Sequence, residues 1–126
     1  MLLDKYQTNL CSIITASIPE IDYWCHIIRY DTGLDDKGRQ TRFAKILMRD
    51  VEGEGDKHLH VVTVDTIDWA FQRLMTDDDL DFVTPSFRRR MRALYHMEAD
   101  PSAIAYTGED TNQLVQIGLF GKVIYD

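Results

Sequence analysis

Cysteine and long apolar runs are both scarce in this chain, and each scarcity excludes a class of protein. Two cysteines among 126 residues are too few for a disulfide scaffold or a four-thiolate zinc site. No apolar run approaches the ~20 residues that a membrane-spanning helix requires. The first residues include Asp4 and Lys5, which place charges where a signal peptide has its apolar stretch. We therefore expect a soluble, cytoplasmic protein with reduced thiols.

Catalytic motifs are also missing from the sequence. Gly53-Glu-Gly55 has no third glycine and precedes a predicted strand, so it is not a dinucleotide-binding or phosphate-binding loop. The acids of residues 77–81 resemble the start of a calcium-binding EF-hand loop, but Phe82 replaces its glycine and Arg88 replaces its bidentate glutamate. The sequence therefore favours a protein that is not an enzyme, and it indicates no cofactor.

The composition that is present is typical of one globular domain, and its charge is unevenly distributed. A hydrophobic share of 44% excludes a wholly disordered chain, and the length predicts a single domain over residues 1–126. Acidic residues number 21 and basic residues 14, a net charge of −7. Residues 85–97 contain four arginines and no acid, so the remainder carries −7 − 4 = −11. This acidity argues against non-specific binding of nucleic acid over the whole surface.

The N-terminal segment has the apolar spacing of a helix. Leu3, Tyr6, Leu10 and Ile13 recur at steps of three and four residues, which places them on one face. Pro19 disfavours helical geometry at the preceding residue. We therefore expect this helix to end near Ser17.

Three β-prone segments follow, separated by polar turns that contain glycine. Residues 21–30 and 58–64 are rich in aromatic or β-branched side chains. Residues 41–51 are compatible with a strand or a short helix, and the flanking turns favour a strand. Three strands joined by two short loops predict an antiparallel meander.

After the third predicted strand, the spacing of apolar residues is again that of a helix. Asp65 or Thr66 is placed to cap one helix, and Thr84 and Pro85 have the residue types of an N-cap and a first helical position. The other expected boundaries are a helix end before Thr76, a helix end at Asp100-Pro101, a third helix over 111–119, and a short C-terminal strand over 122–125 at one sheet edge.

The order of these elements predicts an α+β fold. It consists of an N-terminal helix, a three-stranded antiparallel meander, three helices packed on one face of the sheet, and a short C-terminal strand. Self-association through a sheet edge would make the protein a homo-oligomer.

The arginine-rich helix carries the clearest functional signal. At about 100° per residue, Arg88, Arg89 and Arg92 lie on one face beside the apolar stripe, and Arg90 points away from both. Arginine makes bidentate contacts with carboxylate or phosphate. The alternative is that the acids of residues 77–81, or acids elsewhere on this acidic chain, neutralise this helix within the molecule.

Histidines supply a second candidate site. His58 and His60 lie two residues apart on a predicted strand and therefore share a face, and His26 lies on the first strand. Together they could form a three-nitrogen metal site. The alternative is that they are ordinary solvent-facing side chains of a half-exposed strand. Asp65 and Asp68 lie where a strand meets a helix, and capping of that helix accounts for them.

The closing stretch, residues 114–125, contains Gly118-Leu-Phe-Gly-Lys122. It resembles the ends of small phage and prophage proteins of unknown function. The resemblance implies an origin and no particular activity.

These features lead to three functional hypotheses. The first is a non-catalytic interaction or regulatory protein that binds a protein partner through Arg88, Arg89 and Arg92. The second is a metal-dependent hydrolase that uses His26, His58 and His60. The third is a weak nucleic-acid binder that uses the same arginine helix, and it is disfavoured because nucleic-acid binders of this size are usually basic overall.

Overall fold

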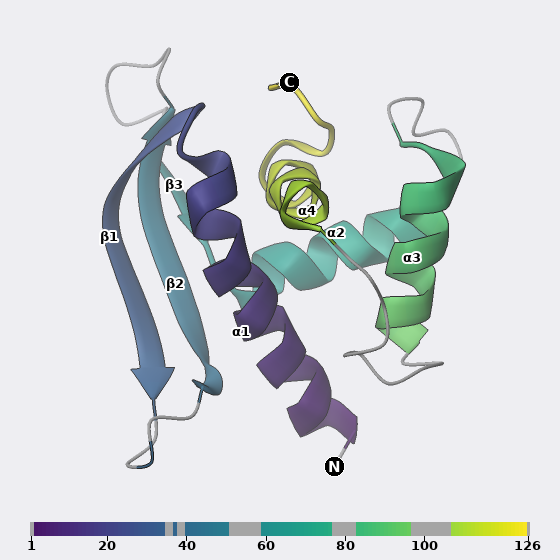
Figure 1. The fold of residues 1–126 in the computed structure, drawn as a ribbon, viewed down its shortest axis with the longest axis horizontal. Helices are drawn as coiled ribbons and strands as arrows, with labels where there is room; N and C mark the ends of the chain where they lie inside the picture. Colours follow the sequence, from purple (N-terminus) through teal and green to yellow (C-terminus); the bar gives the residue numbers. More distant parts are fainter. Residues whose placement is uncertain are drawn as a thin grey trace.

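The computed structural model describes residues 2–34, 37, 40–50, 59–76, 83–96 and 107–125. Its elements are α1 (Leu2–Ile21), β1 (Cys25–Leu34), β2 (Gln40–Asp50), β3 (Leu59–Val62), α2 (Val64–Thr76), α3 (Pro85–His96) and α4 (Gly108–Phe120). The sheet lies at one end of the molecule and α3 at the other, with the remaining helices between them (Figure 1). The expected α+β layout is confirmed. None of the helices in these ranges is long and apolar enough to cross a membrane.

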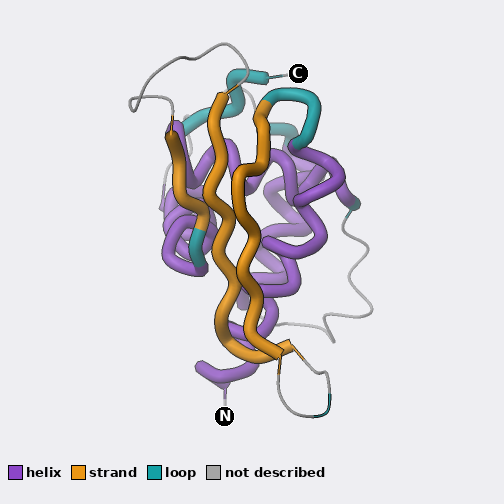
Figure 2. The backbone as a smooth tube through the Cα atoms, turned by 90° about the vertical axis from the view of Figure 1, so that its left-hand side faces the viewer, coloured by secondary structure: helices purple, strands orange, loops and turns teal. Residues whose placement is uncertain are grey.

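The sheet has the order β1-β2-β3, and both strand pairs are antiparallel, as the meander prediction requires. The segment that could have been a short helix is strand β2. β1 begins four residues later than predicted, because Ile21 belongs to the preceding helix. Helices α1, α2 and α4 lie on one face of the sheet, and none of the described helices lies on the other face (Figure 2). The prediction that every later helix packs on the sheet is wrong for α3, which packs against α2.

The prediction that the first helix ends near Ser17 is wrong, because α1 continues through Pro19 to Ile21. A proline in the last turn removes only one backbone donor, so the helix tolerates it there. The end of the helix is also well supported. Ile21 is fully buried, and its carbonyl accepts hydrogen bonds from the Trp24 backbone N–H at 3.1 Å and from the Cys25 thiol at 3.3 Å.

The predicted starts of α2 and α3 meet different outcomes. α2 begins at Val64, so neither Asp65 nor Thr66 is its N-cap; instead the Thr66 hydroxyl accepts a hydrogen bond from the Thr63 N–H at 3.1 Å. The predicted start of α3 is confirmed, since the Thr84 hydroxyl accepts from the Phe87 N–H at 3.2 Å. The predicted end of that helix at residues 100–101 lies outside the described residues.

α4 starts three residues earlier than predicted. Thr107 is its N-cap, and Thr107 and Asp110 form a capping box in which each side chain accepts a hydrogen bond from the other residue's backbone N–H. The helix closes at Gly121, which has φ 76° and whose N–H donates to the Ile117 carbonyl at 2.9 Å. A positive φ favours glycine at this position.

The predicted C-terminal strand is wrong: residues 122–125 are described and do not form a strand. Gln116 of α4 makes hydrogen bonds with the backbone of Ile124 and Tyr125, and the Tyr23 hydroxyl also donates to the Tyr125 carbonyl at 3.1 Å. The Gln116 amide oxygen accepts from the N–H groups of Ile124 and Tyr125 at 2.9 and 2.8 Å, and its amide nitrogen donates to the Tyr125 carbonyl at 3.1 Å. We call this arrangement the Gln116 clamp. It occupies the groups that a sheet edge would otherwise pair.

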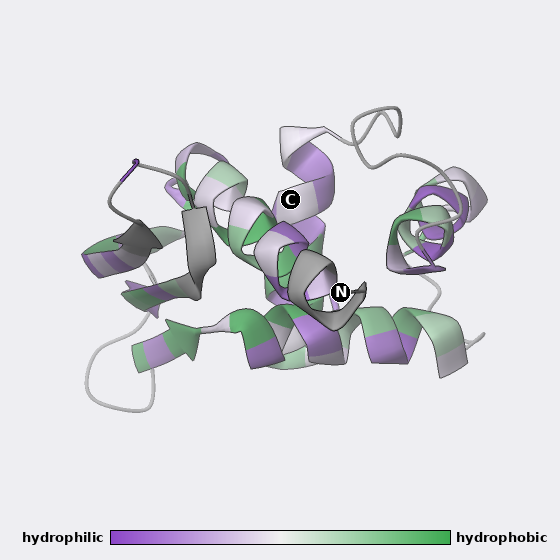
Figure 3. Cartoon of the chain, turned by 90° about the horizontal axis from the view of Figure 1, so that it is seen from below, coloured by the Kyte–Doolittle hydropathy of each residue, from purple (hydrophilic) through white to green (hydrophobic). Residues whose placement is uncertain are grey.

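One buried cluster receives side chains from all seven elements. Hydrophobic and hydrophilic residues alternate along the strands, and α3 has a hydrophobic side and a hydrophilic side (Figure 3). α2 and α4 cross closely at Gly118, where an added Cβ would collide with the Thr66 backbone carbonyl oxygen. Glycine is therefore required at this crossing.

Candidate functional site on α3

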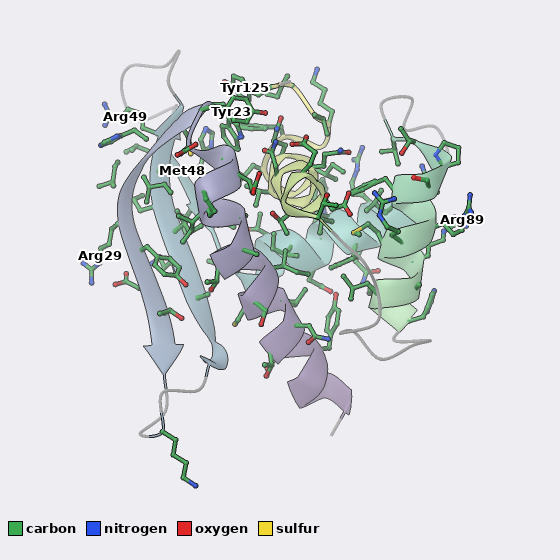
Figure 4. The ribbon with its side chains drawn as sticks, in the orientation of Figure 1. Tyr23, Arg29, Met48, Arg49, Arg89 and Tyr125 are labelled. Atoms are coloured by element: carbon green, nitrogen blue, oxygen red, sulfur yellow. The ribbon has the colours of Figure 1, made fainter. Side chains whose placement is uncertain are left out.

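The arginines of α3 divide into two pairs with different surroundings. Arg89 and Arg92 are exposed, and they are neighbours because they lie three residues apart on a helix. Arg89 extends from α3 on the side opposite the sheet (Figure 4). Arg88 is half-buried, and its guanidinium donates a 2.6 Å hydrogen bond to the Leu74 carbonyl in the last turn of α2. Arg88 therefore caps a helix end, while Arg89 and Arg92 face solvent.

Arg90 was expected to point away from both the core and the face formed by the other three arginines. Its side chain does not simply extend into solvent, because it reaches Asp110 of α4. Its guanidinium makes a two-point ion pair with the Asp110 carboxylate, with N···O distances of 3.0 and 2.7 Å. Asp110 is only 2% exposed and also accepts from the Thr107 N–H at 3.1 Å. The hydrogen bonds that the Arg90 guanidinium donates to this carboxylate raise the pKa of Arg90 above its usual value.

The sequence alone did not show that Arg90 would reach α4. Asp110 lies 20 residues later in the chain, and the pairing depends on how α3 and α4 are placed. The acids of residues 77–81, which were the expected internal partners of the arginine helix, lie outside the described residues. Within the described part of the chain, the acid that pairs with this helix is Asp110.

The structure does not bring His26 and His60 together. His26 pairs with Arg49 across β1 and β2, whereas His60 pairs with Met48 across β2 and β3. Directly paired residues share a face and successive residues alternate, so the two histidines lie on opposite faces of the sheet. His26 is exposed, and the His60 ring makes an edge contact with Phe120 on the helix side. Their predicted partner His58 lies outside the described residues.

A metal centre is therefore not assembled from the histidines whose positions are known. Among the described residues, no group of three or more His, Cys, Asp or Glu side chains is placed to hold a metal ion. Cys11 and Cys25 are both buried and are not joined in a disulfide, and burial raises the pKa of the Cys11 thiol, which disfavours the thiolate form. Neither thiol has the surroundings of an activated nucleophile.

A small hollow of about 170 Å³ lies between α1 and α2, and it includes both acids that stand at the strand-to-helix junction. Asp65 is exposed there. Asp68 accepts a 2.6 Å hydrogen bond from the Tyr6 hydroxyl. Burial, followed by this hydrogen bond, raises the pKa of Tyr6 well above its usual value. Asp68 therefore fixes a tyrosine between two helices, a structural role.

The two tryptophans differ in exposure. Trp24 is buried, and its indole N–H donates to the Asn112 side chain at 2.9 Å. Trp69 is 45% exposed on α2, and the Arg73 guanidinium lies over its ring at 5.1 Å from the ring centre. Trp69 is thus the tryptophan that could contact a partner, but it lies on α2 and not on the arginine helix.

The chemistry available at α3 is the recognition of an anion. Arg89 and Arg92 present two exposed guanidiniums on one helix, and a guanidinium can donate hydrogen bonds to a carboxylate or a phosphate. No protein-family model matches the chain, and no curated protein or solved structure matches it. The resemblance of residues 114–125 to the ends of phage proteins therefore stays a prediction.

Proposed function

We propose that this protein is a non-catalytic interaction protein that binds a carboxylate-rich region of another protein through Arg89 and Arg92. The observation that carries the proposal is the division within α3. Arg88 and Arg90 contact Leu74 and Asp110 of the fold, whereas Arg89 and Arg92 are exposed on a helix that those contacts hold in place. A contact patch on a rigid element loses less conformational entropy on binding than one on a loop.

A protein partner is favoured over nucleic acid because of the charge on the rest of the molecule. The chain carries a net charge of −7, so it repels a polyanion approaching from most directions. If Arg89 and Arg92 contacted two phosphates of a duplex, the log-log salt slope would be only about −1.8, at ~0.9 per phosphate. Such binding would be weak and would be lost at modest salt concentrations.

The test is the double variant Arg89→Glu/Arg92→Glu, compared with Lys122→Glu as a matched control. Lys122 is exposed on the C-terminal segment, so its replacement changes charge away from α3. Crosslinking and capture from a cell lysate would be followed by mapping of the crosslinked segment of each captured protein. We expect crosslinks from α3 to Asp- or Glu-rich segments for the parent and the control, and none for the double variant.

Binding to labelled duplex and single-stranded DNA and RNA is measured in parallel. Binding of the parent to any of these at ~150 mM salt, lost in the double variant, would replace the protein partner with nucleic acid. Capture that is equal for the parent and the double variant would remove α3 from the proposal.

The metal-dependent hydrolase receives no support from His26 and His60, which lie on opposite faces of the sheet, and it depends on His58. Metal analysis of the protein purified without chelator tests it. A cytoplasmic location belongs to the same proposal, and it is supported by Cys11 and Cys25, which are not joined in a disulfide and so fit a reducing compartment.

A further inference from the structure

The open face of the sheet carries a second set of basic side chains, which sequence analysis did not single out. The strand register places Asp31 beside Lys45, Arg29 beside Leu47, and His26 beside Arg49. On the other side of β2, Val61 lies beside Leu47 and Leu59 lies beside Arg49. Paired residues share a face. Ala44, Ile46 and Met48 are buried on the opposite face, so these side chains point away from the helices.

The pictures agree with this assignment. In Figure 4 the labelled side chains of Arg29 and Arg49 extend from the sheet on the side away from the helices, whereas Arg89 lies at the other end of the molecule. We call the surface formed by these strand side chains the outer sheet face. Its members are His26, Arg29, Asp31, Lys45, Leu47, Arg49, Leu59 and Val61.

The outer sheet face combines an aliphatic centre with positive charge. Leu47 and Val61 lie side by side in its middle, and Val61 is 43% exposed. Among the described side chains of this face, Arg29, Lys45 and Arg49 are opposed by a single carboxylate, Asp31, in a chain whose net charge is −7. A shallow hollow of about 290 Å³ is lined by Arg29, Asp31, Lys45, Leu47 and Val61.

Among the described side chains of this face, the ion pair between Arg29 and Asp31 leaves most of the positive charge available. Arg29 Nε lies 2.8 Å from the Asp31 carboxylate, but the Arg29 side chain is 72% exposed. A surface pair of this kind contributes little to stability, so its guanidinium can turn to another carboxylate at low cost. Arg29 and Asp31 both line the hollow, so Arg29 is beside the place that a partner would occupy.

We propose that the outer sheet face docks a segment of another protein in which aliphatic side chains stand next to Asp or Glu. The aliphatic side chains would cover Leu47 and Val61, and the carboxylates would meet Lys45, Arg49 and Arg29. Charge complementarity selects this occupant. Two copies of the chain meeting face to face would oppose like charges, and a phosphate backbone has no apolar groups to cover the aliphatic centre.

This inference is independent of α3, and one experiment separates the two surfaces. A library of random peptides, each about 12 residues long, the length of one recognition segment, is displayed and selected against the immobilised full chain. Enriched peptides are synthesised with a fluorescent label, and their Kd values are measured by anisotropy. Amide shifts in a two-dimensional NMR spectrum locate the binding surface.

We expect enriched peptides that combine aliphatic residues with Asp or Glu and that shift amides of β1, β2 and β3. Lys45→Glu/Arg49→Glu should weaken their binding by about tenfold or more, because charge pairs become like-charge contacts. Val61→Thr preserves side-chain shape and β-propensity and should weaken binding by about threefold through loss of apolar contact. Lys122→Glu and Arg89→Glu/Arg92→Glu should each change Kd by less than about twofold.

Several results would overturn the inference. These are a lack of enrichment, enriched peptides without acidic residues, and peptides that bind Lys45→Glu/Arg49→Glu or Val61→Thr as tightly as the parent. Peptides lost only in Arg89→Glu/Arg92→Glu would support the α3 proposal and reject this one. Binding of single-stranded oligothymidine, or dimerisation in light scattering, that is abolished by Lys45→Glu/Arg49→Glu would assign the face to nucleic acid or to a second copy. Val61→Thr keeps the test valid if the charge variant fails to fold.

Discussion

α3 and the outer sheet face are both basic surfaces of an acidic protein, and they lie at opposite ends of the molecule (Figure 1). On α3, Arg88 caps α2 and Arg90 pairs with Asp110, whereas Arg89 and Arg92 are exposed. On the outer sheet face, Arg29 and Lys45 are both exposed. The ion pair found among its described residues, between Arg29 and Asp31, lies at the surface. The two surfaces therefore use the same kinds of residue in different ways.

The difference follows from the geometry of the elements. Successive arginines on a helix are turned by about 100°, so a run of them must include side chains that point toward neighbouring helices. Alternate residues on a strand all point to one side, so cations at positions 29, 45 and 49 share a face without any of them entering the core. A run of arginines in a helical sequence therefore suggests a larger basic surface than the helix presents. Basic residues that are dispersed in the sequence can form a basic surface on a sheet that the sequence does not reveal.

The largest effect expected concerns the contact that distinguishes Arg90 from its exposed neighbours. Asp110→Ala removes the buried partner of Arg90 and half of the capping box of α4. We expect a loss of about 2 kcal/mol in the free energy of unfolding, from the lost ion pair with a partly exposed arginine together with the lost capping bond. Urea denaturation measures it.

Asp110→Asn is the informative companion, because it removes the charge but retains an acceptor for the Thr107 N–H. The free energy of unfolding of Asp110→Asn should lie between that of the parent and that of Asp110→Ala. A cost below about 0.5 kcal/mol for Asp110→Ala would show that Arg90 behaves like a surface residue and would erase the division within α3.

A smaller, pH-dependent effect concerns Tyr6, the α1 residue that contacts both α2 and α3. The Tyr6 ring contacts both Phe71 of α2 and Tyr95 of α3, and its hydroxyl donates to Asp68. Tyr6→Phe should cost about 1.5 kcal/mol at neutral pH, since a hydrogen bond to a charged group is lost. Because the pKa of Tyr6 is raised in the folded state, the unfolded chain releases this proton first.

The sign of the pH dependence follows from that difference. The contribution of Tyr6 is fully present below about pH 10, the usual pKa of tyrosine, and is lost as pH rises above it. The parent and Tyr6→Phe should therefore converge in stability between neutral and strongly alkaline pH. Parallel stability curves across that range would contradict the assigned role of the Tyr6 hydroxyl.

The smallest effect separates the arginines of α3 from one another. Arg88→Ala should lower the free energy of unfolding by about 1 kcal/mol, because the Leu74 carbonyl loses its donor. Arg89→Ala should change it by less than about 0.5 kcal/mol, as for other exposed positions. Thermal unfolding of the two variants side by side is sufficient. Equal losses of stability in the two variants would show that the hydrogen bond from Arg88 to Leu74 contributes no more to stability than an exposed arginine does.

Most of the fold was predictable from local signals. The Thr84-Pro85 pair identified the start of α3, and the alternation and turns of residues 21–64 identified the meander. The errors occurred where a distant contact decided the outcome. Pro19 is tolerated because Ile21 is buried in the core, and residues 122–125 are not a strand because Gln116 binds their backbone groups. The α4 start was visible as Thr107-Gly-Glu-Asp110, a capping-box pattern that the prediction overlooked.

The site was predictable only in part. Helical periodicity placed Arg89 and Arg92 on one side of α3, and the structure leaves both exposed. The contacts of Arg88 with Leu74 and of Arg90 with Asp110 span 14 and 20 residues of sequence, and no local pattern encodes them. His26 and His60 lie on opposite faces of the sheet, and this could be seen only once the register of the three strands was known.

The Gln116 clamp has a consequence for measurements of hydrogen exchange. The amide protons of Ile124 and Tyr125 are held by one buried side chain, so they should exchange with deuterium more slowly than those of an ordinary chain end. Their protection would be indistinguishable from that of a β-strand in an exchange map. Gln116→Ala should make both amides exchange rapidly while the amides of β1–β3 keep their rates, so one glutamine alone would account for the protection of this segment.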